Sequence, residues 1–130
     1  MNHDTFLKLA CTQAEISQQA GGIASGALLV KAGEIVAQSH NKTCQLNDPI
    51  AVAAVDCIRT AGRRSDQAEL SLYTTDYPDM LCAGTMLQFS IGAIVIGLPE
   101  TDTAAIRLLQ QKGVPVTFNP YPACQELHNS

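Results

Sequence analysis

Asp79 and Cys82 are the residues of this sequence whose types and spacing could do chemistry together. They lie three residues apart after Pro78, where a helix is expected to begin, so both side chains could face one metal ion. Two ligands do not make a zinc site unless His40 or Cys44 joins them from the preceding loop. Two other interpretations stay open. Asp79 caps the helix while Cys82 is a buried core thiol, or Cys82 is a redox-active thiolate at the helix N-terminus.

The charge and composition of the chain limit the classes of partner that we expect it to bind. Among 130 residues, 8 Lys and Arg stand against 12 Asp and Glu, which gives a net charge of −4. An acidic domain binds the nucleic-acid backbone poorly, so no nucleic-acid partner is expected. No apolar run reaches the length of a membrane span, so no membrane partner is expected either. Five cysteines without a C-x-x-C pair, behind a polar N-terminus without a signal-peptide pattern, predict free thiols in the cytoplasm.

Apolar periodicity and turn residues predict an alternation of strands and helices. Helices are predicted over residues 4–20, 49–61, 78–89 and 101–112, and strands over residues 27–30, 34–37, 70–75, 93–97 and 114–118. Residues 43–48 are predicted to be a polar loop, and the tail 119–130 to hold at most one helical turn. An opening hairpin followed by strand–helix units predicts an α/β fold, a three-layer α/β/α sandwich around a mixed five-stranded sheet. The length predicts one domain over residues 1–130.

Short motifs in the predicted order carry a resemblance to a known family. They are GALLV at 26–30, HN at 40–41, NDP at 47–49, DCIRTAGRR at 56–64, LYTT at 72–75, Pro78, and CAG at 82–84. In this order and spacing, the sequence resembles the cytidine deaminase-like superfamily, and most of all its cytosine, guanine and tRNA-adenosine deaminase branch. The resemblance covers about residues 21–124 and implies a deaminase-like domain.

The resemblance also implies a zinc centre whose residues this sequence replaces. In the family, an H-x-E motif and a P-C-x-x-C motif supply one His and two Cys ligands, and the Glu shuttles protons. The positions of the His and the Glu correspond here to Val52 and Ala54, and that of the first Cys to Asp79. Only the second Cys is kept, as Cys82. We therefore expect no catalytic residue, no cofactor and no metal, with Asp79 and Cys82 as weak metal candidates.

The same resemblance implies a vestigial ligand-binding pocket. Asn41 takes the place of an Asn that hydrogen-bonds the base, although it could instead be a turn residue that bonds its own backbone. The Tyr77 ring could fill the vacated pocket or stack on a planar ligand. Tyr73 and Thr74 are expected on the strand beneath it. The expected pocket residues are Asn41, Val52, Ala54, Tyr77, Asp79 and Cys82.

These positions lead to two hypotheses on function. The first is a catalytically inactive deaminase-like protein, a pseudoenzyme, that binds a small planar ligand or a partner subunit; an enzyme is not favoured. The alternative is a hydrolase or deaminase that acts on a nucleobase-like substrate with a remodelled site around Asp79 and Cys82. Charged residues make up only 15% of the chain, so apolar surface is expected to meet another subunit, and a homodimer is expected. A short tail predicts that a lid over the pocket is missing or rudimentary.

Overall fold

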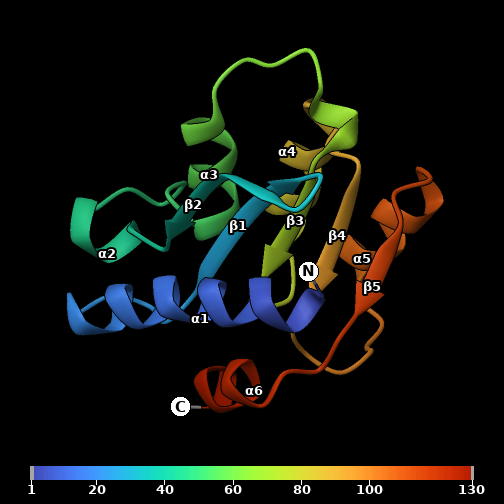
Figure 1. Ribbon diagram of the computed structural model, residues 1–130. Helices are drawn as coiled ribbons and strands as arrows, with labels where there is room; N and C mark the ends of the chain where they lie inside the picture. The colour runs from blue at the N-terminus through green and yellow to red at the C-terminus, as the bar shows by residue number, and fades with distance from the viewer. Residues whose placement is uncertain (1, 130) are drawn as a thin grey trace.

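A computed structural model describes residues 2–129 as one mixed five-stranded sheet covered by helices on both faces (Figure 1). The strands lie in the order β2-β1-β3-β4-β5. β1 pairs antiparallel with both β2 and β3, whereas β3, β4 and β5 run parallel. The strands are β1 (Gly26–Lys31), β2 (Glu34–His40), β3 (Ser71–Thr74), β4 (Ala93–Ile96) and β5 (Val116–Phe118). The predicted α/β fold with a mixed five-stranded sheet is confirmed.

The helices form the two outer layers. They are α1 (His3–Gln19), α2 (Thr43–Leu46), α3 (Ala53–Ala61), α4 (Met80–Gln88), α5 (Ala104–Gln111) and α6 (Pro122–Asn129), with a 3-10 turn η1 (Gln67–Glu69). α1 packs across β1, β2 and β3 and also contacts α6. α3, α4 and α5 follow one another as neighbours, and α3 covers β1 and β2.

Side-chain alternation along the strands puts these layers on opposite faces. Tyr73 of β3 packs against Phe6 of α1, with ring centroids 5.1 Å apart. The next residue, Thr74, therefore points to the other face. Gly26 permits the close approach of α1, because a Cβ there would lie 2.1 Å from the carbonyl oxygen of Ala10.

Three local predictions were wrong. The helix expected from Pro49 begins at Ala53, since Asp48 Oδ1 accepts a hydrogen bond from the Ile50 nitrogen at 2.9 Å and so forms a turn instead of a helix cap. The expected loop 43–48 contains the short helix α2. The tail forms α6, a helix of eight residues, because Cys124 is fully buried against the core.

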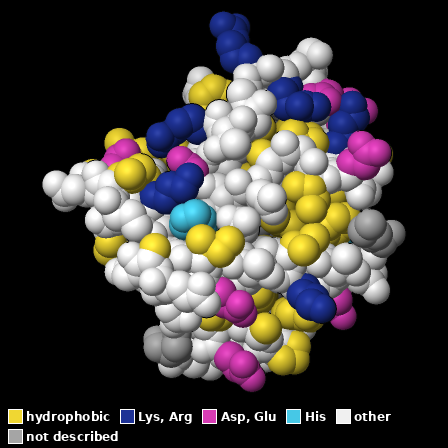
Figure 2. All heavy atoms as spheres, turned by 60° about the vertical axis from the view of Figure 1, so that its left-hand side comes forward, with side chains coloured by type: hydrophobic (Ala, Val, Ile, Leu, Met, Phe, Trp, Pro, Cys, Tyr) yellow, Lys and Arg dark blue, Asp and Glu magenta, His cyan; other side chains and the backbone are white. Residues whose placement is uncertain are grey.

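Charged side chains compensate one another locally on the surface. Lys31 and Arg64 both bind Asp66, at 2.9 and 2.8 Å. Figure 2 shows Lys and Arg side chains lying beside Asp and Glu side chains over the upper part of one face. Within residues 2–129, no helix is long and apolar enough to cross a membrane.

Candidate functional site

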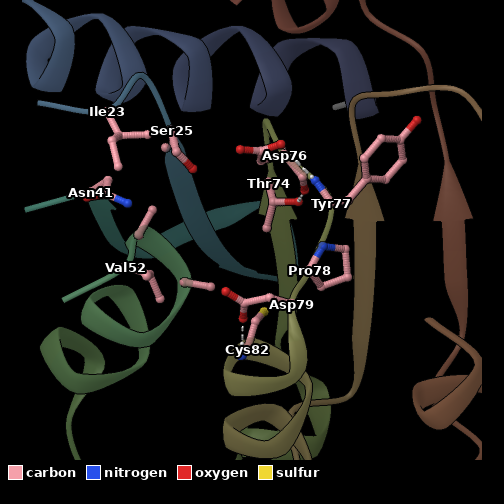
Figure 3. Close-up of a pocket in the computed structure, with 13 residues that line it drawn as sticks. Ile23, Ser25, Asn41, Val52, Thr74, Asp76, Tyr77, Pro78, Asp79 and Cys82 are labelled. Carbon is pink, nitrogen blue, oxygen red and sulfur yellow. Dashed lines mark hydrogen bonds between the residues drawn. The ribbon is translucent and has the colours of Figure 1, made fainter. Parts of the chain in front are cut away.

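A cavity of about 100 Å³ lies between the N-terminus of α3 and the turn that joins β3 to α4. It is the place where the sequence predicted the vestigial pocket, and the structure brings all six predicted residues to its wall (Figure 3). The complete lining is Ile23, Ser25, Gly26, Asn41, Val52, Ala53, Ala54, Thr74, Asp76, Tyr77, Pro78, Asp79 and Cys82. None of the described residues in this lining is Lys, Arg or His, so its charged groups are carboxylates.

The α3 wall of the cavity is apolar. Val52 is the N-cap residue of α3 and makes no side-chain capping bond, since its side chain has no acceptor. Ala54, in the first turn, is 8% exposed. Neither side chain can bind a metal ion or carry a proton. This wall therefore offers shape and apolar contact only.

The α4 wall carries the two residues with reactive groups. Asp79 is the N-cap of α4, and its Oδ1 accepts a hydrogen bond from the Cys82 nitrogen at 2.8 Å. Its other oxygen points across the pocket toward Val52 (Figure 3). Burial, helped by the nearby charge of Asp79, raises the pKa of the Cys82 thiol to about 12. The thiol is therefore protonated at neutral pH, which favours the interpretation as a cap and a core thiol over a redox-active thiolate.

Asn41 has the turn role that the sequence offered as one of two alternatives, and a contact with a base stays a prediction. Its Oδ1 accepts hydrogen bonds from the nitrogen and the hydroxyl of Thr43, at 2.9 and 2.7 Å, and so fixes the turn into α2. This uses the oxygen side of the amide. The nitrogen side points into the cavity (Figure 3). The side chain is 6% exposed, so the donor is held rigidly.

A buried carboxylate beside the cavity fixes the loop that carries Asn41. Asp56 of α3 accepts hydrogen bonds from the Ser39 hydroxyl and from Lys42 Nζ, the latter at 2.8 Å. Burial alone would raise the pKa of Asp56, but these hydrogen bonds and the charges of Lys42 and Arg59 outweigh it and hold the pKa below its usual value. Lys42 follows Asn41 directly, so this ion pair ties the loop to α3.

Tyr77 stands at the rim and its ring does not fill the pocket, whereas stacking on a planar ligand stays a prediction. The ring points away from Val52 and Cys82 (Figure 3), and its hydroxyl donates to the Pro99 carbonyl at 2.7 Å. His128 of α6 contacts the ring edge-on at 5.5 Å and lies 3.0 Å from Asp76 Oδ1. α6 thus reaches the rim of the cavity, where the sequence had predicted a missing or rudimentary lid.

Several pocket residues were missed by sequence reasoning. Ser25 lies directly before β1, and its carbonyl oxygen accepts a hydrogen bond from the backbone nitrogen of Asn41 at 2.9 Å. No motif predicted this residue. Asp76 lies between the LYTT motif at 72–75 and Pro78, and neither of these motifs includes it. Thr74 was placed beneath the pocket, and the alternation of β3 could have shown that it faces the pocket while Tyr73 faces α1.

Comparison with known proteins identifies the family. Residues 1–98 match the family model described as the cytidine and deoxycytidylate deaminase zinc-binding region. The chain therefore belongs to this family, within the cytidine deaminase-like superfamily that the motifs indicated.

Individual relatives place the chain among nucleobase and tRNA-adenosine deaminases. The guanine deaminase of Bacillus subtilis is 38% identical over 108 residues, which cover 80% of this chain and 69% of that protein. The tRNA-specific adenosine deaminase of Aquifex aeolicus is 33% identical over 98 residues, 73% of this chain and 65% of that protein. The X-ray structure of guanine deaminase from Bacillus subtilis superposes with a TM-score of 0.68 at 37% identity, covering 74% of this chain and 64% of that one. The chain thus spans about two thirds of the length of these relatives.

The family match corrects one expectation. No cofactor was expected, but the matched region is defined as a zinc-binding region, and zinc is the metal that the family implies. The residues at the cavity do not fit the family's three-ligand centre. Of the four positions that the motifs assign to it, Val52 and Ala54 have no ligand atoms, and Asp79 and Cys82 supply only two ligands. Within residues 2–129 no group of three or more His, Cys, Asp or Glu side chains is arranged to hold a metal ion.

Proposed function

We propose that this chain is a member of the deaminase family that binds a small planar, nucleobase-like ligand without hydrolysing it. The observation that carries the proposal is the apolar α3 wall formed by Val52 and Ala54. The sequence motifs predict that these two residues correspond to the family's His and Glu. General acid–base catalysis contributes about 10²–10⁴-fold to a rate, and an alanine supplies none of it. The cavity itself is kept, with a volume of about 100 Å³.

The polar groups of the cavity suit a ligand rich in N–H donors. Asp76 and Asp79 can accept hydrogen bonds, and Asn41 supplies one fixed donor. Planar nucleobases carry amino and ring N–H groups next to carbonyl or ring-nitrogen acceptors. The absence of Lys, Arg and His from the described lining disfavours a phosphate group inside the cavity.

The alternative is a hydrolase or deaminase acting on a nucleobase-like substrate through a remodelled site around Asp79 and Cys82. In its favour, both side chains lie on the cavity. Against it, the Asp79 carboxylate already caps α4, and the raised pKa keeps the Cys82 thiol protonated. The ligand-binding function therefore has the stronger support.

A second copy of the chain is the partner that we include in the proposal. An apolar groove of about 340 Å³ runs between α3 and α4, with Val55, Ile58 and Phe89 in its lining. Phe89 is 45% exposed, and Met80 and Leu81 of the same helix are exposed too. A surface of this kind is favourable to bury in a homodimer.

The free thiols agree with a reducing cytoplasm as the place of action.

Molar mass in solution tests the homodimer. Light scattering coupled to size-exclusion chromatography should give twice the chain mass for the wild type and the monomer mass for Phe89→Asp. Leu9→Asp is the matched control, since Leu9 is 37% exposed on α1, in the opposite layer. A monomeric wild type contradicts the homodimer.

Thermal shift with free purine and pyrimidine bases tests ligand binding. A ligand at 100 times its Kd should raise the Tm by roughly 5–10 °C. Ala54→Leu fills the cavity and should abolish the shift, whereas Ala104→Leu, on the exposed face of α5, should keep it. A shift that survives Ala54→Leu, or no shift with any base, contradicts the proposed function.

A further inference from the structure

Two buried cysteines that are far apart in the sequence touch between α1 and α6. The sulfur atoms of Cys11 and Cys124 lie 3.1 Å apart, although 113 positions separate the residues. Cys11 is 3% exposed and Cys124 is fully buried. Both thiols are free. A thiol pair at this separation needs only a small shift to form a bond.

Cys124 is the anchor of α6. It is the one fully buried side chain of this helix within the described residues. Gly97, directly after β4, makes the room for it, because a Cβ at Gly97 would lie 2.5 Å from the Cys124 sulfur. Ala123 and Leu127 also pack against the core but are only partly buried. Local opening of this C-terminal helix would expose both thiols to solvent.

The position of α6 also shapes the rim of the cavity. His128, one turn beyond Cys124, lies 3.0 Å from Asp76, which lines the cavity. An interaction that fixes the position of Cys124 therefore also stabilises the contact between His128 and Asp76.

The two thiols differ in acidity. The hydrogen bond from Cys124 lowers the pKa of Cys11 despite its burial. The same hydrogen bond, together with burial, raises the pKa of Cys124. Cys11 is therefore the more acidic thiol of the pair, and we assign it the first attack.

We propose that Cys11 and Cys124 form a reversible dithiol–disulfide couple that locks α6 onto α1 and with it the His128 contact at the cavity rim. A small-molecule disulfide such as glutathione disulfide is the oxidant. The Cys11 thiolate attacks it and releases one glutathione, and Cys124 then displaces the second glutathione to form the protein disulfide. Two electrons pass to glutathione, and the two thiol protons end on the two glutathione molecules released.

Oxidation of the purified full chain in glutathione redox buffer tests the couple. Thiols are alkylated under denaturing conditions, and intact mass and peptide mapping count and locate those that are lost. We expect the loss of two thiols, a linked peptide joining Cys11 to Cys124, and a Tm higher by about 10 °C than that of the reduced protein. Hydrogen exchange in α6 should slow by roughly tenfold or more.

Two variants test whether the oxidation is specific to the pair of Cys11 and Cys124. Cys44→Ser removes the exposed thiol and should leave the oxidation unchanged. Cys124→Ser should lose both the linked peptide and the gain in Tm. The wild-type map decides the matter even if Cys124→Ser fails to fold. A linked pair of other cysteines, no loss of thiols, or a linked peptide without slower exchange in α6 overturns the proposal.

Discussion

The Asp79 carboxylate caps helix α4 by accepting a hydrogen bond from the backbone nitrogen of Cys82 at 2.8 Å. The sequence motifs predict that Asp79 corresponds to the family's first zinc-binding cysteine and Cys82 to the second. The carboxylate satisfies one of the free N–H groups of the helix and lies at the positive end of its dipole. Asp79 thus has a structural role as the cap of α4.

Asp79→Ala should lower the free energy of unfolding by about 1 kcal/mol, because α4 loses its cap. Asp79→Asn is the control, since its amide oxygen can still accept the bond from Cys82. Urea denaturation of the three proteins measures the difference. Equal stability of Asp79→Ala and the wild type would show that the cap contributes nothing.

Cys82 should be inert toward thiol reagents in the folded protein. Its pKa of about 12 leaves almost no thiolate at pH 8, and the side chain is 4% exposed. Cys44, which is exposed, should react first with iodoacetamide and serves as the internal reference. Peptide mapping after brief labelling separates the two. Labelling of Cys82 as fast as that of Cys44 would restore the thiolate interpretation.

Asp56→Asn should lower the free energy of unfolding by about 2 kcal/mol at pH 7, because Lys42 and Ser39 lose a charged acceptor. The folded pKa of Asp56 lies below the unfolded value of about 3.9, so its contribution is present above about pH 4 and is lost as the pH falls through the folded pKa. The deficit of the variant should therefore shrink toward pH 2.

Denaturation at several pH values between 2 and 7 checks this dependence. Asp102→Asn is the matched control, because Asp102 also pairs with a basic side chain, Arg107 at 2.8 Å, but is 73% exposed. Its change should stay within about 0.5 kcal/mol at every pH. A deficit of Asp56→Asn that does not vary with pH would mean that the buried ion pair is not its cause.

Restoring the family's residues should rebuild a zinc centre. The combined variant Val52→His, Ala54→Glu and Asp79→Cys adds two ligands to Cys82 and a general acid–base group. It should bind close to one zinc ion per chain, more tightly than the wild type in competition with a chromophoric chelator. The same variant without Val52→His has one ligand fewer and should bind more weakly. No gain over the wild type would mean that the positions are not equivalent to the family's.

The sequence predicted the sheet and the position of the pocket because both depend on local signals. Alternating strands and helices define the layers, and short motifs around Asp48 and Cys82 locate the two walls. The predicted start of α3 was wrong because the local signal at Asp48 has two meanings. An Asp before a Pro can cap a helix or form a turn, and the choice depends on contacts that the local sequence does not contain.

Features that depend on distant residues were not predictable. Cys11 and Cys124 lie on elements 113 residues apart, and their contact exists only because α6 folds back onto α1. The direction of the Tyr77 ring is likewise set by the Pro99 carbonyl, 22 residues away. The polar tail gave too little apolar periodicity to predict α6.

The most direct test of the proposed function is ammonia release from guanine, cytosine and adenosine by the wild-type protein supplied with zinc. Val52 and Ala54 supply neither a ligand nor a proton carrier, so we predict a rate no higher than that of the blank without protein. The guanine deaminase of Bacillus subtilis serves as the positive control. Zinc-dependent turnover of any of the three substrates that is lost in Cys82→Ser would contradict the account.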